Sequence, residues 1–451
     1  MNLVILSVLV FCSFTMAKVE NTGRLSYAGY KLIRYTPELE SDSLKKIENF
    51  YEGEEDNERH RLRMDVFLEP SKYHHYADIL VAPEYLKHFL LLLSATEIKT
   101  IKIISENVEE LLEKERKING LDRKVRRKRA LTNWQDFDVN RYHTYDEMVE
   151  FMKVLAAQKP DMVQLLNVTK SYEGKPIFGV KIQPPHGSPA DKPSVVMDAG
   201  VHAREWIAPA VALYSIKKLV QNYGIHQNYT NNLNKLNWYI VPQVNPDGYE
   251  FSRTTDRMWR KTRSYNATKS KYCYGADANR NWGFKWAVAG SNHYPCSNIY
   301  SGTRPYSEPE IAGLKDFFTW RIVNPMIYVS LHAYGQLLLS PWGYTEKKPT
   351  NNMDQRNAAA AAVLAMQKLT GSQYNYGTIT EMMYPASGTS IDFMQNNNVP
   401  YIYGVELRPN ERPGISHYGF ELPPKYIAET GEEMIAGIFA MGDHASAVKK
   451  L

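Results

Sequence analysis

The chain has 451 residues, of which 43% are hydrophobic and 23% charged, a composition typical of a globular protein with two or three domains. Its formal net charge is +5, but six basic residues lie in the single run 123–129. Removing these six from +5 leaves −1 for the rest of the chain, which argues against nucleic-acid binding.

The amino terminus has the pattern of a secretory signal peptide. Residues 3–14 form an apolar run too short to span a bilayer, and Thr15 and Ala17 are the small residues of a cleavage site. Met1-Asn2 departs from the pattern because it carries no Lys or Arg. We predict a signal peptide at residues 1–17 and a secreted, extracellular protein with no membrane-spanning segment.

Residues 18–120 predict a small domain of mixed strands and helices. Apolar alternation indicates strands at 29–34, 64–67 and 77–81, and helical spacing indicates helices at 41–51, 83–93 and 106–117. This mixture favours an open α+β sandwich. No catalytic constellation occurs in it.

The basic run 123–129 follows this domain. It is either a solvated linker or a processing site, and bare basic residues in a secreted chain favour cleavage by a trypsin-like or furin-like protease. Cleavage after Arg129 would separate a propeptide, residues 18–129, from a mature domain, residues 130–451.

Apolar strands alternate with helices in the rest of the chain. We expect strands at 162–168, 177–182, 194–198, 238–244, 326–331 and 401–407, and helices at 145–156, 209–222, 308–321, 355–369 and 425–441. We read Asn245-Pro-Asp-Gly248 as a turn. The alternation predicts an α/β fold with a mixed, largely parallel sheet covered by helices on both faces.

Polar side chains stand at the carboxyl ends of these strands, where open α/β sheets bind ligands. His202 and Glu205 follow one strand, His332 follows another, and Glu406 lies in a third strand that is otherwise apolar. Two His and one Glu leave one coordination position open, as in a catalytic zinc site. A carboxylate such as Glu406 could then serve as a general base.

Each of these residues also has a simpler interpretation. His202 and Glu205 could be ordinary polar residues at a helix start, and His143-x-x-Asp146 is a comparable pairing in the same chain. His332 could be an ordinary satisfied polar residue at a strand end. Arg408 could neutralise Glu406, since a buried carboxylate needs a partner.

The segment 256–282 is rich in Arg and Asn. It is either a charged surface loop or a receptor, because Asn279 and Arg280 beside an Arg cluster would form a fork suited to a carboxylate. Arg260 could bind a developing oxyanion.

Two cysteines remain once Cys12 leaves with the signal peptide. Cys273 and Cys296 would form one disulfide in a secreted chain, and two buried free thiols are the alternative. Sequons at Asn167, Asn228 and Asn266 are glycosylation candidates.

Six motifs, in the order found here, resemble those of the zinc metallocarboxypeptidases of the A/B type. They are His-x-Arg-Glu-Trp at 202–206, Arg-x-x-Arg-Lys-Thr-Arg at 257–263, Asp-x-Asn-Arg-Asn-Trp at 277–282, His-x-Tyr at 332–334, Tyr-x-Ala-Ser-Gly at 384–388 and Glu-Leu-Arg at 406–408. The resemblance covers residues 130–451, and the preceding segment is similar to the propeptide of that family's zymogens. It implies an eight-stranded sheet and one bound Zn²⁺.

By matching position, the resemblance implies roles for the residues of the centre. His202, Glu205 and His332 would bind zinc. Glu406 would be the general base that activates the attacking water, and Arg260 would stabilise the tetrahedral oxyanion.

The same resemblance implies the substrate contacts. Asn279 and Arg280 would grip the terminal carboxylate of a peptide or protein, and Tyr384 would close over bound substrate. Arg204 and Tyr334 would contact the peptide further from the cleaved bond.

Three further residues match the family. Asp277 would orient a zinc-binding histidine, and Cys273 and Cys296 match the family's loop disulfide.

Ile391 matches the position where B-type relatives that remove Lys or Arg carry Asp. The other matching pocket positions are uncharged: Gly343, Ile379, Met383 and Ala386. Burying an apolar side chain there would gain about 1.5–3 kcal/mol, whereas a Lys would be left unpaired. The prediction is A-type specificity. Pro385 and Gly404 depart from some relatives, so the preference between aliphatic and aromatic residues stays open.

The sequence therefore predicts a secreted, monomeric zymogen of a zinc exopeptidase that removes apolar C-terminal residues. The alternatives are a B-type enzyme for basic C-terminal residues and an inactive zinc-binding secreted protein. The presence of Glu406 and Arg260 argues against the inactive protein.

Overall fold

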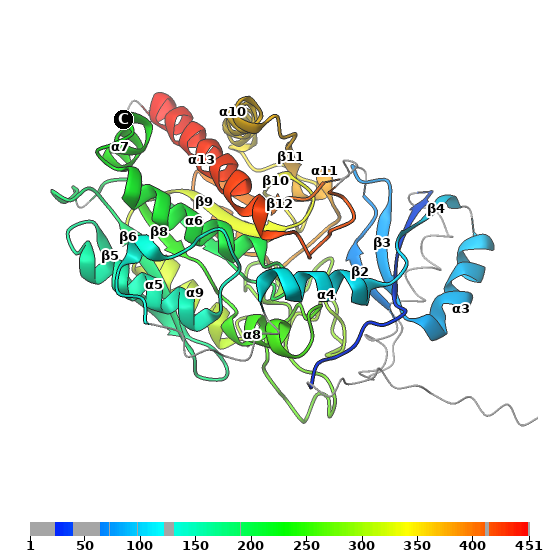
Figure 1. Cartoon of the computed structure of the whole chain (residues 1–451). Helices are drawn as coiled ribbons and strands as arrows, with labels where there is room; N and C mark the ends of the chain where they lie inside the picture. Colours follow the sequence, from blue (N-terminus) through cyan, green and yellow to red (C-terminus); the bar gives the residue numbers. More distant parts are fainter. Residues whose placement is uncertain are drawn as a thin grey trace, which may run out of the picture.

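The computed structural model describes residues 23–449 apart from 39–63, 72, 97, 121–129, 190 and 411–414. A small N-terminal domain (blue) lies beside a larger domain that begins near residue 130 (Figure 1). The predicted signal peptide, the predicted helix 41–51 and the predicted cleavage site at Arg129 lie outside the described residues.

The N-terminal domain contains an antiparallel sheet with the strand order β2-β3-β1-β4. Its elements are β1 (Lys31–Pro37), β2 (Met64–Leu68), β3 (Ala77–Val81), α3 (Pro83–Ser94), β4 (Ile98–Ser105) and α4 (Val108–Asn119). The expected α+β domain is confirmed. Strand β4 was not predicted. Its residues are exposed or half-buried, so no side of the strand faces the core.

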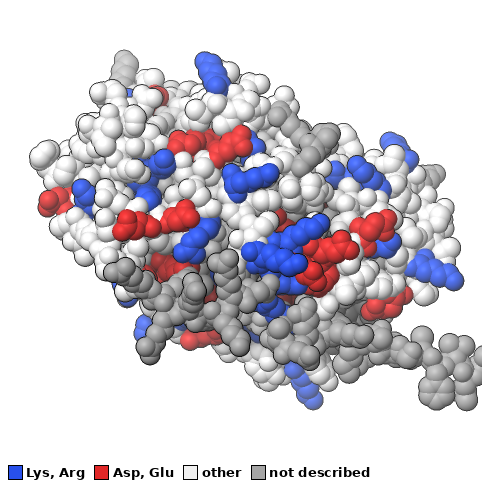
Figure 2. Space-filling view, viewed as in Figure 1, with Lys and Arg blue, Asp and Glu red and all other residues white. Residues whose placement is uncertain are grey.

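Helix α4 presents one buried face to the rest of the protein. Its buried residues are Val108, Glu109, Leu112 and Glu115, so two of the four are carboxylates. The exposed side is charged, and acidic and basic side chains gather side by side over it in Figure 2. Buried carboxylates need partners, which makes α4 a helix that depends on its neighbours.

The larger domain is built on an eight-stranded sheet with the order β11-β10-β12-β9-β7-β8-β6-β5. Its strands are β5 (Val163–Lys170), β6 (Pro176–Ile182), β7 (Ser194–Ala199), β8 (Asn237–Val241), β9 (Pro325–Ala333), β10 (Leu337–Ser340), β11 (Asn375–Thr378) and β12 (Tyr401–Leu407). The four central strands β12, β9, β7 and β8 are parallel. Strands β5 and β6 pair antiparallel to their neighbours, whereas β10 is antiparallel to β12 and parallel to β11. The predicted mixed, largely parallel sheet is confirmed.

Helices cover both faces of this sheet (Figure 1). They are α5 (Tyr145–Gln158), α6 (Ile207–Asn222), α7 (Gln227–Lys235), α8 (Pro246–Thr254), α9 (Pro309–Trp320), α10 (Asn352–Thr370), α11 (Ile379–Met382), α12 (Ser390–Asn396) and α13 (Ile427–Lys449). Along β7, Val195 and Met197 pack with α5, α6, α10 and α13, whereas Val196 packs in a second core with α9 and α12. Among the described residues, no helix combines the length and the apolarity that a membrane crossing requires.

Two expectations for this domain were wrong in detail. Strands β10 and β11 were missed because they are only four residues long. The stretch read as a turn begins α8 instead, since the Asn245 side chain accepts a hydrogen bond from the Gly248 N–H and Pro246 stands in the first turn.

Gly200 turns the chain immediately after β7. It has φ +69°, and a Cβ atom there would lie 1.5 Å from Gln243 Oε1. Only glycine satisfies both the left-handed backbone and the close approach. This turn directs the following residues, among them His202, back over the edge of the sheet.

We therefore expect Gly200→Ala to be strongly destabilising. Left-handed strain and overpacking together should cost about 2–5 kcal/mol of unfolding free energy in a urea titration. Gly224→Ala is the matched control, because Gly224 has φ +77° but its Cβ would meet nothing within 4 Å. It should lose only about 1–2 kcal/mol, and equal losses in the two variants would contradict the proposed clash.

Candidate metal centre and substrate cleft

Three side chains converge at the carboxyl end of the central strands. His202 Nδ1 lies 2.8 Å from Glu205 Oε1, and His332 Nδ1 lies 3.2 Å from both His202 Nδ1 and Glu205 Oε2. All three residues are buried. Within the described part of the chain they form the one group of His, Cys, Asp or Glu whose ligand atoms come within 4.8 Å of one another.

These spacings fit a zinc ion. Ligand atoms at zinc-bonding distance and tetrahedral angles lie roughly 3.3 Å apart. The Nε2 atom of each ring has a hydrogen-bonding partner of its own, so the two Nδ1 lone pairs face one another and the carboxylate. A cation satisfies such a set of acceptors.

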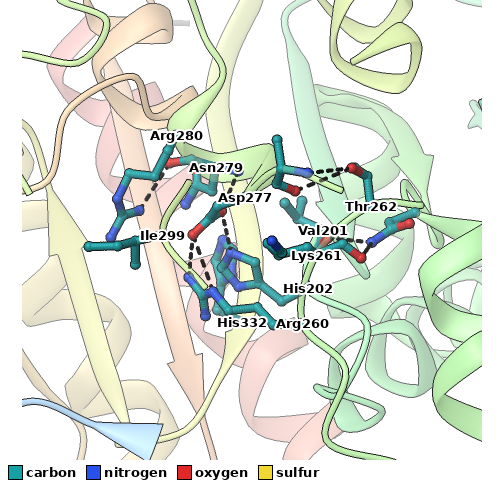
Figure 3. A network of polar contacts seen from close by, with 12 residues as sticks. Val201, His202, Arg260, Lys261, Thr262, Asp277, Asn279, Arg280, Ile299 and His332 are labelled. Atoms are coloured by element: carbon teal, nitrogen blue, oxygen red, sulfur yellow. Dashed lines mark hydrogen bonds and ion pairs between the residues drawn. The ribbon is translucent and has the colours of Figure 1, made fainter. Parts of the chain in front are cut away.

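Asp277 joins the metal centre to Arg260 (Figure 3). Its Oδ1 lies 3.0 Å from His202 Nε2, and its Oδ2 accepts hydrogen bonds from Arg260 Nη2 at 2.8 Å and Nε at 3.2 Å. Burial alone would raise the pKa of Asp277, but Arg260 and His202 hold this pKa well below its usual range. The carboxylate is thus ionised, and His202 donates to it from Nε2.

Glu406 lies opposite His332 where β12 pairs with β9. It lines the same cavity as the three metal-binding residues. Burial raises the pKa of Glu406 to about 7, although His332 opposes the rise. Arg408 is not its partner, because its guanidinium donates hydrogen bonds to Glu433.

His143, from the alternative pairing, lies elsewhere. Its ring stacks on Phe137 with 4.0 Å between centroids, and its Nε2 is 2.6 Å from the Asp138 carbonyl oxygen. It belongs to the core beside α5.

Asn279 and Arg280 line the cavity, and backbone groups hold their side chains. Asn279 Oδ1 accepts a hydrogen bond from the Ser390 N–H at 3.1 Å. Arg280 donates from Nε to the Gly290 carbonyl at 2.7 Å and from Nη1 to the Asn279 carbonyl at 3.0 Å. The remaining lining is largely apolar and includes Leu339, Ile379, Met383, Tyr384, Ala386, Ile391 and Gly404.

Asp392, next to Ile391, is turned toward the backbone. Its two carboxylate oxygens accept hydrogen bonds from the N–H groups of Gly343 at 2.8 Å and Tyr344 at 3.0 Å. Burial raises the pKa of Asp392 to about 7, against the effect of these two donors. It does not line the cavity, whereas Ile391 does.

Arg204 and Tyr334 contact the N-terminal domain. Arg204 Nη1 donates to Asp65 Oδ2 at 2.7 Å, and the guanidinium lies over the rings of Phe67 and Phe420, which contact each other edge to face. Tyr334 Oη is 3.2 Å from Asp78 Oδ2. Asp65 and Asp78 were not predicted from the sequence, because nothing in the sequence of a short strand indicates that its carboxylate pairs with a residue of another domain.

A second interdomain ion pair joins α4 to the larger domain. Arg257 donates to both carboxylate oxygens of Glu115, at 2.7 and 2.9 Å, and also to the carbonyl oxygens of Arg204 and Phe420. Phe67, Leu68 and Glu69 of the N-terminal domain line the cavity itself. The N-terminal domain therefore covers the cleft.

A disulfide joins Cys273 to Cys296, with 5.1 Å between their Cα atoms. It closes the loop that also carries Asp277, Asn279 and Arg280, and so ties down the residues beside the metal centre.

Comparisons with known proteins agree with this geometry. Residues 148–437 match the model of the zinc carboxypeptidase family, and residues 40–115 match that of the carboxypeptidase activation peptide. The chain is 32% identical to carboxypeptidase A1 of Bos taurus, covering 94% of this chain and 95% of the relative. It is 38% identical to carboxypeptidase B of Astacus astacus, covering 67% of this chain and 96% of the relative.

A solved structure, carboxypeptidase A from Helicoverpa armigera, has the same fold with a TM-score of 0.82. It is 26% identical in sequence, and the match covers 94% of this chain and 99% of that chain. With its activation peptide, its zinc-binding group and its covered cleft, this chain belongs to the zinc carboxypeptidase family as a proteolytically activated zymogen.

Proposed function

We propose that the mature domain is a secreted exopeptidase that removes apolar C-terminal residues. The observation that carries the specificity is the largely apolar pocket around Ile391, while the neighbouring carboxylate of Asp392 is engaged by two backbone N–H groups. A basic side chain in this pocket would find no counter-charge. The names of the relatives include both A and B types, so the pocket rather than the names supports the A-type assignment.

Asn279 and Arg280 support action at a free C-terminus. An amide and a guanidinium side by side can bind a terminal carboxylate through several charge-assisted hydrogen bonds. Tyr384 lines the same cavity and would close over the bound end of the peptide. A peptide without a free carboxylate would not form these charge-assisted hydrogen bonds.

Hydrolysis would use Glu406 and Arg260. Glu406 would take a proton from the attacking water and pass it to the leaving amine. Arg260, fixed by Asp277, would donate to the developing oxyanion. Zinc bound by His202, Glu205 and His332 would polarise the scissile carbonyl and lower the pKa of the water. An inactive zinc-binding protein would have no need for Glu406 or Arg260.

We further propose residues 1–17 as a signal peptide, residues 18–129 as the propeptide and residues 130–451 as the mature enzyme. A trypsin-like or furin-like protease would cut after Arg129. The exposed sequon residues Asn167, Asn228 and Asn266 suit glycosylation in the secretory pathway, and the disulfide suits an oxidising compartment. The mature enzyme would act as a monomer.

A panel of peptides ending in Phe, Leu, Lys and Glu tests the specificity. We expect kcat/KM for Phe and Leu to exceed that for Lys by about 10–100-fold, because only apolar side chains gain from burial in the pocket. Ile391→Asp should raise the rate for Lys relative to the rates for Phe and Leu. Ile391→Asn is the control, because Asn is similar in size to Asp but carries no charge. Faster release of Lys by the wild-type enzyme would overturn the A-type assignment.

Glu406→Gln should lose about 10²–10⁴-fold in kcat while retaining zinc. The base must be ionised, so in the wild type kcat/KM should fall as the pH drops below the pKa of Glu406. Burial raises this pKa to about 7, and the charge of bound zinc would lower it again. The acidic limb of the pH profile is therefore expected below pH 7, and its persistence in an active Glu406→Gln enzyme would exclude Glu406 as the base.

Asp65→Ala should weaken the hold of the cleaved propeptide on the enzyme. Truncating one partner of a buried ion pair costs about 2–5 kcal/mol, so activity should appear faster after limited trypsin cleavage of the full-length zymogen. Glu106→Ala is the control, because Glu106 pairs with Lys31 at an exposed site within the N-terminal domain. Identical activation time courses for the two variants would show that Asp65 does not hold the propeptide.

A further inference from the structure

A second chain of hydrogen bonds leads away from the metal centre through His332. The Nδ1 atom of His332 faces the other two metal-binding residues, and its Nε2 atom is 3.1 Å from Ser330 Oγ. Ser330 Oγ in turn donates to Asp198 Oδ1 at 2.8 Å. Tyr328 Oη donates to the other oxygen of Asp198 at 2.5 Å.

Strand geometry places these groups together. Tyr328, Ser330 and His332 are two residues apart along β9, so their side chains share one face of the sheet. Asp198 lies directly opposite Ser330 where β7 pairs with β9. Asp198, Ser330 and Tyr328 have no exposed surface, so these contacts are shielded from bulk solvent.

The proton positions follow from the metal centre. If Nδ1 of His332 is to offer its lone pair to zinc, Nε2 must carry the proton and donate it to a hydrogen bond. Ser330 Oγ is then the acceptor, which obliges its own hydroxyl proton to point to Asp198. His332 is then the first donor, Ser330 accepts from it and donates in turn, and Asp198 is the final acceptor.

Asp198 is a carboxylic acid in a buried strand, where burying its polar group is costly unless it forms hydrogen bonds. Burial raises the pKa of Asp198, and the hydroxyl groups of Tyr328 and Ser330 oppose this rise. Both direct partners of Asp198 are hydroxyl groups, and the ring of His332 lies beyond Ser330. Asp277 has the equivalent place behind His202, but in direct contact.

We propose that Ser330 and Asp198, supported by Tyr328, are positioning residues that fix the tautomer and ring orientation of His332 for zinc binding. Zinc affinity of the intact zymogen is the appropriate measurement, because it requires neither activation nor a substrate. The proposal uses the zinc centre alone, so a failure of the proposed specificity would leave it unaffected.

The first test is equilibrium zinc binding against a competing chelator. Ser330→Ala should raise the zinc Kd by about 10–100-fold, the usual effect of losing an outer hydrogen-bond partner of a ligand histidine. Ser330→Thr keeps the hydroxyl and should restore the Kd to within about threefold of the wild type. Ser215→Ala is the matched control, since Ser215 is equally buried but donates to Val211 in α6, and its Kd should be unchanged.

A double-mutant cycle tests whether Asp198 acts through Ser330. Asp198→Asn alone should weaken zinc binding, and it should have little further effect in the Ser330→Ala background. Equal effects of Asp198→Asn in the two backgrounds would overturn the proposal, as would a Ser330→Ala protein with wild-type zinc affinity. If Ser330→Ala does not fold, Tyr328→Phe provides the second test, and it should weaken zinc binding only while Asp198 is present.

Thermal unfolding separates positioning from general stability. Ser330→Ala should lower the Tm of the zinc-loaded zymogen more than that of the chelator-treated zymogen, because the lost interaction is coupled to the metal. An equal decrease in both forms would assign Ser330 a purely structural role and contradict the proposal.

Discussion

The parallel register of β7, β9 and β12 is the constraint on which the rest of this protein depends. It places Glu406 opposite His332 and brings the turn after β7 beside them. A shift of one residue in either pairing would move these side chains to the other face of the sheet. Apolar cores on both faces fix the register, so the geometry of the metal centre is a consequence of how the sheet is packed.

The interface between the two domains contains buried ion pairs, whereas the cores on either side of it are apolar. The carboxylates Asp65 and Glu115 of the N-terminal domain supply the counter-charges of the buried Arg204 and Arg257. Ion pairs of this kind contribute modestly to affinity and strongly to specificity, because a displaced or mismatched cover leaves buried charges unpaired. The N-terminal domain is therefore held in one orientation over the cleft.

The central strands could be predicted because a parallel sheet buried on both faces reads as continuous apolar runs, and Glu406 stood out as a charge within one of them. The four-residue strands β10 and β11 lack any such run. The partners of Arg204 and Arg257 could not be predicted either, since Asp65 and Glu115 lie 139 and 142 residues away in sequence. The contacts of Asp198 could not be predicted either, because they depend on the pairing of β7 with β9 and not on a local sequence pattern.

The assembled state of the centre beneath its cover has a consequence for activation. His202, Glu205 and His332 already have zinc-binding spacing while Asp65 and Glu115 still hold the N-terminal domain in place. Removing the propeptide would thus uncover a metal-binding group that is already assembled. Because Phe67, Leu68 and Glu69 line the cavity, the N-terminal domain would limit access to these residues in the intact chain, and a ligand small enough to pass beneath it would meet the assembled metal-binding group.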